Sequence, residues 1–144
     1  MNDALPLNVK ILHANAVLPT KSTEDAAGLD LYAIETVILF PNTPTKVRTG
    51  LAMQIPRGHV GLIFDRSGLG SKGVLRLAGV IDQDYEGEVL VILALIGHLS
   101  LTLHARDRIA QMVILPIPKI SVREAWDTAR HSSRGEGGLG STGA

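Results

Sequence analysis

Short apolar runs rich in β-branched residues dominate this chain and restrict what it can fold into. The sequence holds 11 Val, 12 Ile and 9 Thr, and such side chains suit the pleated surface of a strand better than a helix. Turn-forming residues such as Pro41, Pro56 and Gly97 separate the runs. Many short strands predict an all-β sandwich, jelly roll or barrel. We expect the strands in Leu7–Leu12, Leu29–Ile34, Thr36–Phe40, Lys46–Ile55, His59–Phe64, Glu88–Leu95, Leu99–Leu103 and Arg108–Leu115.

The length of 144 residues corresponds to one domain, and 45% hydrophobic with 19% charged residues is typical of a globular chain. Helical turns are expected only in Ser67–Lys72 and Val122–Arg130. The segment from Arg134 to Ala144 is rich in glycine and has little to bury. We therefore expect a single β domain in residues 1–130 and a mobile Gly-rich arm in residues 131–144.

Charge and cysteine content exclude several functions. The formal net charge is +0 and no cysteine is present, so we expect no direct nucleic-acid binding, no disulfide and no thiolate or sulfur-ligated zinc site. The longest apolar run, Val89–Ile96, is far shorter than the ~18 residues of a membrane-spanning helix. The first residues lack the regions of a signal peptide. We expect a cytoplasmic protein without membrane contact.

The same run is apolar on both faces, unlike a strand with one face in water. Such a strand needs cover on both sides. Val89–Ile96 is therefore a candidate subunit interface.

A row of carboxylates at alternate positions, Asp82, Asp84, Glu86 and Glu88, is the first candidate for chemistry. In a regular strand these four groups would share one face and repel one another. We expect Gly87 to bend the segment, so that one or two carboxylates turn inward and the others face water. A solvated hairpin is the simpler interpretation of this spacing.

The apolar approach Leu77–Ile81 favours a functional interpretation of Asp82. We expect this apolar run to be a buried strand with Asp82 at its end. A half-buried carboxylate there can act as a base and orient a water molecule. Tyr85 follows and offers a flat ring to a sugar or a base, or simply packs at the rim.

The run Asp65–Gly73 combines glycines with Arg66, Ser67, Ser71 and Lys72. Free backbone N–H groups, hydroxyls and a guanidinium fork are what a phosphate group needs, so the run predicts an anion cradle, although any Gly/Ser-rich turn with two basic residues would look alike. No histidine has a metal-ligand spacing, and no serine lies in a G-x-S-x-G elbow, so water is the expected nucleophile.

Five blocks, in order along the chain, resemble the five motifs of the trimeric dUTPases, the deoxyuridine 5'-triphosphate nucleotidohydrolases. These blocks are Ala27–Ala33, Arg66–Gly70, Gly79–Val89, Asp107–Gln111 and Arg134–Gly143. The resemblance implies a jelly-roll-like β fold, a homotrimer whose three active sites are each built from all three chains, and hydrolysis of dUTP to dUMP and pyrophosphate. Such an enzyme limits uracil incorporation into DNA and supplies dUMP for dTMP synthesis.

The resemblance also assigns roles to matching positions. Asp82 would hold the attacking water and accept from the 3′-hydroxyl, and Tyr85 would pack under the deoxyribose and exclude a 2′-hydroxyl. Uracil would be read by the main chain near Leu90 and in the segment Gly79, Val80, Ile81 and Asp82.

On the phosphate side, the resemblance implies that Arg66, Ser67 and Gly68 bind the α- and β-phosphates and that Gln111 contacts the phosphate chain near the water. Asp30 would support Mg²⁺ indirectly, through water. The arm would close over the substrate with residues Arg134, Leu139, Gly140, Ser141 and Thr142.

Three positions depart from the family pattern. Leu139 stands where an aromatic residue is usual, Asp65 where proline is common, and Arg106 where glycine is frequent. Two alternatives to dUTP hydrolysis stay open: a dCTP deaminase-like enzyme of the same fold, and a nucleotide-sensing binding module without turnover. The deaminase is disfavoured because Val89–Leu95 carries no ionisable side chain where deaminases have a catalytic glutamate.

Overall fold

The computed structural model describes residues 4–97 and 99–138. Ten strands and one helical turn make up the described regular structure. In chain order they are β1 (Asn8–Ile11), β2 (Leu29–Tyr32), β3 (Val37–Leu39), β4 (Thr45–Gln54), β5 (His59–Phe64), α1 (Ser67–Gly70), β6 (Val74–Leu77), β7 (Val80–Ile81), β8 (Glu88–Leu95), β9 (Leu101–Leu103) and β10 (Arg108–Pro116).

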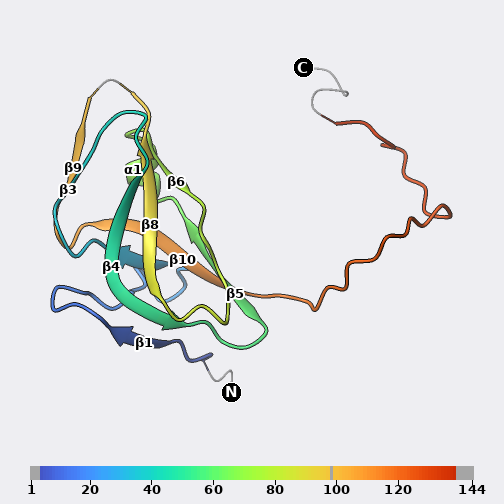
Figure 1. Cartoon of the computed structure of the whole chain (residues 1–144), viewed down its shortest axis with the longest axis horizontal. Helices are drawn as coiled ribbons and strands as arrows, with labels where there is room; N and C mark the ends of the chain where they lie inside the picture. Colours follow the sequence, from blue (N-terminus) through green and yellow to red (C-terminus); the bar gives the residue numbers. More distant parts are fainter. Residues whose placement is uncertain (1–3, 98, 139–144) are drawn as a thin grey trace.

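These strands form three antiparallel sheets around one core (Figure 1). The first sheet has the order β1-β4-β8-β6, the second β2-β10-β5-β7, and β3 pairs with β9 in the third. Fully buried side chains come from all three sheets, for example Val47 and Val91 from the first, Leu31 and Met112 from the second and Leu39 from the third. The all-β prediction is therefore confirmed.

The predicted runs agree with eight of the observed strands to within two residues at each end, and two strands were missed. β6 and β7 were not predicted, because both are short and lie beside turn residues: Gly73 precedes β6, and Ala78 and Gly79 separate β6 from β7. The turn predicted near Ser67 is present as α1, whereas Val122–Arg130 contains no helix. That segment is exposed, and helical turns without an apolar face packed on a core are only marginally stable.

β8 buries one face and leaves the other partly open. Val89, Val91 and Leu93 point into the core, whereas Leu90 is 36% exposed on the outer face. The register places Leu77 of β6 beside Ile92 and Leu75 beside Ala94. We call the outer side chains of Leu75, Leu77, Leu90, Ile92 and Ala94 the apolar face. In residues 4–97 and 99–138, no segment covers this face completely, and its role as a subunit interface stays a prediction.

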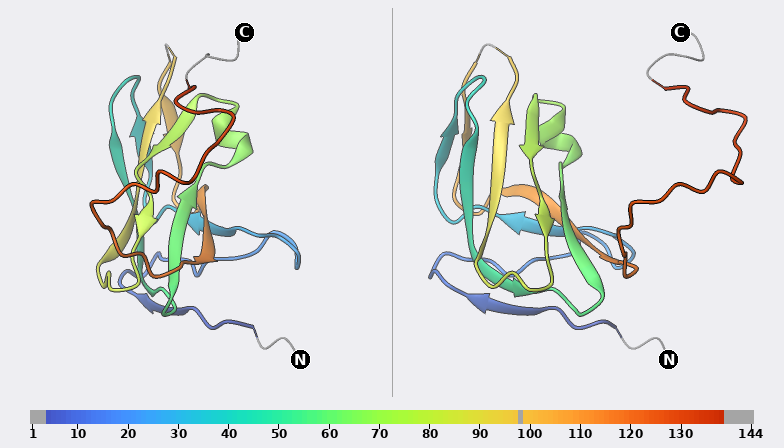
Figure 2. Two further views of the ribbon diagram at one scale, coloured as in Figure 1. Left: turned by 90° about the vertical axis from the view of Figure 1, so that its right-hand side faces the viewer. Right: turned by 45° about the vertical axis from the view of Figure 1, so that its right-hand side comes forward.

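After β10, residues 117–138 form no strand and lead away from the β body, as Figure 2 shows. Large apolar side chains are almost fully exposed here, with Val122 at 94% and Trp126 at 89%. The predicted boundary between a domain and an arm at residue 131 stays a prediction, and residues 139–144 lie outside the described part of the chain. In the described residues, no helix is long and apolar enough to span a membrane.

Candidate functional site

Asp30 on β2 is the centre of a charged cluster at one end of the second sheet. Its side chain is only 8% exposed, and its Oδ1 accepts from Arg66 Nε at 2.8 Å. Arg108, at the start of β10, places Nη1 at 3.5 Å from Asp30 Oδ2. Oδ2 is buried and has no hydrogen-bond partner among the described residues. One buried carboxylate thus orients two arginines that come from different motifs.

The two arginines border an open cavity of about 400 Å³ next to α1. Gly68 and Lys72 line it as well, and a Cβ added at Gly68 would meet no atom within 4 Å. We call Arg66, Gly68, Lys72 and Arg108 the cationic cradle. Its three cations border, together with Asp107, a space that an anion can enter. Arg66, Gly68 and Lys72 come from the run Asp65–Gly73, for which an anion cradle stays a prediction. Ser67, at the start of α1, is exposed beside it.

Gln111 joins the same end of the sheet through pairing on both sides. On β10 it lies opposite Asp30 of β2 and opposite Phe64 of β5. Its Nε2 donates to the carbonyl of Asp65 at 2.8 Å. A Cβ at Gly28 would lie 2.2 Å from Gln111 Oε1. The side-chain amide of Gln111 therefore fits here because Gly28 has no side chain.

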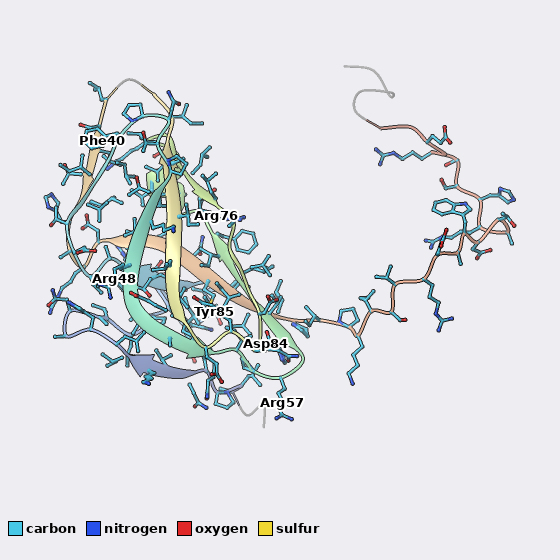
Figure 3. The ribbon with its side chains drawn as sticks, viewed as in Figure 1. Phe40, Arg48, Arg57, Arg76, Asp84 and Tyr85 are labelled. Carbon is cyan, nitrogen blue, oxygen red and sulfur yellow. The ribbon has the colours of Figure 1, made fainter. Side chains whose placement is uncertain are left out.

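A second, separate hollow lies beside the third motif. This cavity of about 160 Å³ is lined by Val80, Ile81, Asp82, Tyr85, Glu88 and Leu90, and we call it the Tyr85 slot. The Tyr85 hydroxyl donates to the Glu88 carbonyl at 2.9 Å, and the Tyr85 amide donates to the Asp82 carbonyl at 3.2 Å. Figure 3 shows Tyr85 and Asp84 in the loop that leads to β8. These bonds fix the ring at the wall of the slot.

Asp82 differs from the expectation in its burial. It is exposed in the single chain and not half-buried. The reason is the position of β7, a two-residue strand that pairs only with β5 at the edge of the second sheet and leaves Val80 65% exposed. The apolar run Leu77–Ile81 passes from one sheet to the other and does not enter the core as a buried strand.

The other carboxylates of the row behave as the bend at Gly87 predicted. Glu88 turns inward, where its carboxylate accepts from Arg48 Nε at 3.2 Å and from the Gly50 amide at 2.8 Å. Asp82, Asp84 and Glu86 are exposed. Because Arg48 and Gly50 are on β4, these bonds of Glu88 link β8 to β4.

The register shows that the two hollows lie far apart in one chain. Ile81 pairs with Gly61 of β5, so Asp82 falls level with Val60, whereas Gln111 pairs with Phe64. Because β5 lies between β7 and β10, a rise of about 3.3 Å per residue and a strand spacing of about 4.8 Å separate Asp82 from Gln111 by roughly 15 Å. The structure therefore does not bring these two side chains together within a single chain.

Two of the three unusual positions have structural explanations. The Asp65 carboxylate accepts a hydrogen bond from the Arg76 amide at 2.6 Å, so this side chain links the end of β5 to the backbone of β6. Arg106 has a φ of 71° in the turn between β9 and β10, which is the left-handed conformation that favours glycine. Leu139 lies outside the described residues.

The predicted arm residues are mostly not described. Arg134 is exposed, and its Nε donates to the Gly137 carbonyl at 2.7 Å. Gly140, Ser141 and Thr142, like Leu139, lie outside the described residues. In the described ranges, no group of three His, Cys, Asp or Glu side chains is placed to hold a metal ion.

Two residues near the site were not singled out from the sequence. Arg108 is the cation that completes the cradle, and its signal was its place directly after Asp107 in the fourth motif. Arg76 lies on β6 with its guanidinium 5.5 Å from the centre of the Phe64 ring. No sequence pattern pointed to Arg76, because its contacts depend on β6 and β5 meeting in space.

Comparisons with known proteins identify relatives over nearly the whole chain. A family model described as dUTPase matches residues 14–143. The deoxyuridine 5'-triphosphate nucleotidohydrolase of Ehrlichia canis (strain Jake) is 40% identical over 151 residues, covering 98% of this chain and 96% of the relative.

Solved structures are similar over the same length. A variant of the dUTPase of Staphylococcus bacteriophage 80alpha, with dUpNHpp, has a TM-score of 0.86 and 30% identity, covering 98% of this chain and all of that one. A variant of the dUTPase of phage phi11 of S. aureus, described with a structural Mg(II) ion, has a TM-score of 0.79 and 25% identity, covering 88% of this chain and 100% of that one.

Proposed function

The chain belongs to the dUTPase family, and we propose that it hydrolyses dUTP to dUMP and pyrophosphate by attack of water on the α-phosphorus. The observation that carries the proposal is a cationic cradle and a Tyr85 slot in a chain that the dUTPase family model matches over residues 14–143. The activity predicted from the five motifs agrees with the names of the relatives, and the two alternatives are not favoured.

The cradle is the phosphate side of the proposed site. Arg66, Ser67 and Gly68 bind the α- and β-phosphates, with Arg66 held in orientation by Asp30 at 2.8 Å. Hydrolysis moves negative charge onto the leaving pyrophosphate, so fixed cations stabilise the transition state more than the ground state. Gln111, fixed by Asp65, contacts the phosphate chain beside the attacking water.

The Tyr85 slot is the nucleoside side. Uracil is read by the main chain of Gly79, Val80, Ile81 and Asp82 and lies near Leu90. The Tyr85 ring, fixed by its hydroxyl to Glu88, packs under the deoxyribose and leaves no room for a 2′-hydroxyl. The Asp82 carboxylate orients the water and accepts from the 3′-hydroxyl.

The separation of the two hollows supports an oligomeric active site. Asp82 and Gln111 lie roughly 15 Å apart by strand geometry, so they act on one water only if they come from different copies. The apolar face on β6 and β8 borders the Tyr85 slot through Leu90. Burial of this face against a second copy joins one chain's slot to another chain's cradle, and three copies close the ring as a homotrimer.

The arm completes the proposed site. Fully extended, residues 131–144 span at most about 45–50 Å, which is enough to reach a neighbouring copy. Arg134, Ser141 and Thr142 then close over the γ-phosphate, and Leu139 with Gly140 covers the uracil. Leu139 gives apolar cover without the ring stacking that an aromatic residue adds, a contribution of about 1–3 kcal/mol per base.

The donor set fits Mg²⁺ held mainly by the substrate. The described residues offer no cluster of protein ligands, and Mg²⁺ keeps several waters when phosphates bind it. Asp30 Oδ2, which has no hydrogen-bond partner among the described residues, is an acceptor at the cradle for a metal-bound water. When bound, the ion would add to the neutralisation of the phosphate charge. The location of the enzyme in the cytoplasm stays a prediction from the sequence.

The test is pyrophosphate release from dUTP with Mg²⁺ by the wild type, by Asp82→Asn and by the matched control Asp84→Asn. Asp84 lies in the same loop and is exposed. We expect release by the wild type and the control, its loss in Asp82→Asn, and negligible turnover of dTTP and dCTP. In ¹⁸O-labelled water the label is expected in dUMP.

Three results would contradict the proposal. Ammonia release from dCTP would favour a deaminase. Binding of a non-hydrolysable dUTP analogue without turnover of dUTP would favour a nucleotide sensor. Label found only in pyrophosphate would exclude attack on the α-phosphorus.

A further inference from the structure

Ala78 and Gly79 form a strained corner where the chain leaves the first sheet and enters the second. Their φ angles are 60° and 126°, and β6 before them and β7 after them belong to different sheets. A left-handed conformation is unfavourable for a residue with a Cβ, such as Ala78. The corner therefore needs contacts that hold it.

Part of the corner is fixed by β5. The Ile63 amide donates to the Gly79 carbonyl at 2.8 Å. A Cβ at Gly79 would lie 3.0 Å from the Ile63 carbonyl oxygen, so the backbone of Gly79 packs closely on the strand. These contacts fix Gly79 but leave the carbonyl of Ala78 to another partner.

Arg76 supplies that partner. Its Nη1 donates to the Ala78 carbonyl, two residues further along the chain. The guanidinium lies over the Phe64 ring at 5.5 Å from the centroid, and the Arg76 amide donates to the Asp65 carboxylate at 2.6 Å. Phe64 is the last residue of β5 and Asp65 follows it directly, so both the backbone and the side chain of Arg76 are tied to the end of that strand. Figure 3 shows Arg76 on β6, on the side of the body that also carries Tyr85.

The charge of Arg76 is not used in an ion pair. The ion pairs of the described residues join Arg48 to Glu88 and both Arg66 and Arg108 to Asp30. Arg76 Nε is buried and has no hydrogen-bond partner there. An arginine with these contacts serves to hold a backbone carbonyl and not to pair with a carboxylate.

We propose that Arg76 is a positioning residue for the nucleobase: it holds the left-handed Ala78–Gly79 corner in the shape that presents the main chain of Gly79–Asp82 to the base. This inference rests on the proposed function, because it concerns how the same slot recognises uracil. Arg76 acts through the Ala78 carbonyl and does not itself touch the reacting atoms. A looser corner admits more conformations of the slot and therefore binds the base less tightly.

The test compares steady-state kinetics of Arg76→Met, Arg76→Lys and the control Arg57→Met with the wild type. Arg57 is exposed and does not line the slot. For Arg76→Met we expect KM for dUTP to rise about fivefold or more, with kcat within about twofold, because a preorganising hydrogen bond is lost. Arg76→Lys keeps a donor and a charge and should recover part of the loss. Arg57→Met should match the wild type.

A double variant separates positioning from general stability. Glycine adopts the left-handed conformation without steric cost, so Ala78→Gly in the Arg76→Met background should bring KM back toward the wild-type value. If Arg76→Met lowers only the melting temperature and leaves KM unchanged, Arg76 contributes to general stability and not to positioning, and the proposal is overturned. If Arg76→Met does not fold, Arg76→Lys takes its place, and an unchanged KM in that variant overturns the proposal as well.

Failure of this inference is distinct from failure of the proposed function. A wild type that hydrolyses dUTP while Arg76→Met keeps its KM refutes only the role of Arg76. If the wild type releases no pyrophosphate, the proposed function fails. In that case calorimetric titration with dUMP still tests the slot, and equal affinity of wild type and Arg76→Met refutes the role of Arg76.

Discussion

Arg66 Nε lies 2.8 Å from Asp30 Oδ1, although the two residues belong to different motifs. Asp30 is on β2, whereas Arg66 lies between β5 and α1, and β2 and β5 are not neighbouring strands. β10 separates β2 from β5, and its first residue, Arg108, approaches the other oxygen of the same carboxylate. The buried negative charge is thus balanced by two partly exposed positive charges. Because of this pairing, cationic side chains lie together at the cradle while the buried Asp30 carboxylate keeps positively charged partners.

Asp30→Ala tests this arrangement. We expect unfolding free energy to fall by about 1–3 kcal/mol, less than for a fully buried pair because both arginines reach solvent. Loss of the fixed orientation of Arg66 should lower kcat/KM for dUTP by about tenfold or more, which corresponds to ~1.4 kcal/mol. Urea denaturation and steady-state kinetics measure the two effects. Asp25→Ala, an exposed aspartate before β2, should change neither.

Gly28→Ala should lower activity with little change in stability. The new methyl group would occupy the position of Gln111 Oε1, 2.2 Å from the built Cβ. The flexible amide can move aside at small cost to the fold, but it then loses its hydrogen bond to Asp65. We expect kcat to fall about tenfold, equivalent to ~1.4 kcal/mol, while the unfolding free energy changes by less than about 1 kcal/mol.

A double-mutant cycle with Gln111→Ala checks that cause. If Gly28 acts through Gln111, Gly28→Ala should have almost no further effect on kcat once the amide is absent, because the two changes share one interaction. Additive losses in the double variant would show that Gly28 serves some other purpose.

Arg106→Gly should stabilise the protein. Arg106 has a φ of 71°, and its amide donates to the Ala33 carbonyl at 2.7 Å, a bond that glycine also makes. Relief of the left-handed strain, partly offset by the entropy of glycine, is expected to add about 0.5–1 kcal/mol to the unfolding free energy. Arg106→Ala keeps the Cβ and should bring no gain. Equal stability of both variants would contradict the explanation.

Most strands were predictable because their patterns are local. Runs such as Thr45–Gln54 and Glu88–Leu95 alternate or continue apolar residues until a turn residue ends them, and the observed bounds follow that signal. β7 was not predictable, because a strand of two residues at a sheet edge is too short to show an alternating pattern. The expected half-burial of Asp82 was wrong for a related reason: the apolar run before it crosses between two sheets and is not one buried strand.

The site was predictable as a set of residues and not as a set of contacts. Resemblance in the motifs identified Asp30, Arg66 and Gln111, but their common position follows from the order β2-β10-β5, which no local pattern encodes. Arg76 was missed for the same reason. Its partners are Phe64 at the end of β5 and Ala78 in the corner between β6 and β7, which come together only in the folded chain.

Tyr85 offers the sharpest test of sugar discrimination. In the proposed site its ring excludes a 2′-hydroxyl, and the hydroxyl bond to the Glu88 carbonyl at 2.9 Å fixes the ring close to Gly87, where a Cβ would lie 2.5 Å from the Tyr85 oxygen. Tyr85→Ala should open the space and lower the ratio of kcat/KM for dUTP to that for UTP by about tenfold or more.

Tyr85→Phe keeps the ring and loses only the anchoring hydrogen bond, a net contribution of about 0.5–1.5 kcal/mol. This variant should therefore keep most of the discrimination against UTP while binding dUTP somewhat less tightly. Kinetics with both nucleotides measure the two effects. If Tyr85→Ala rejects UTP as strongly as the wild type does, another group excludes the 2′-hydroxyl, and the ring serves only to pack against the loop at Gly87.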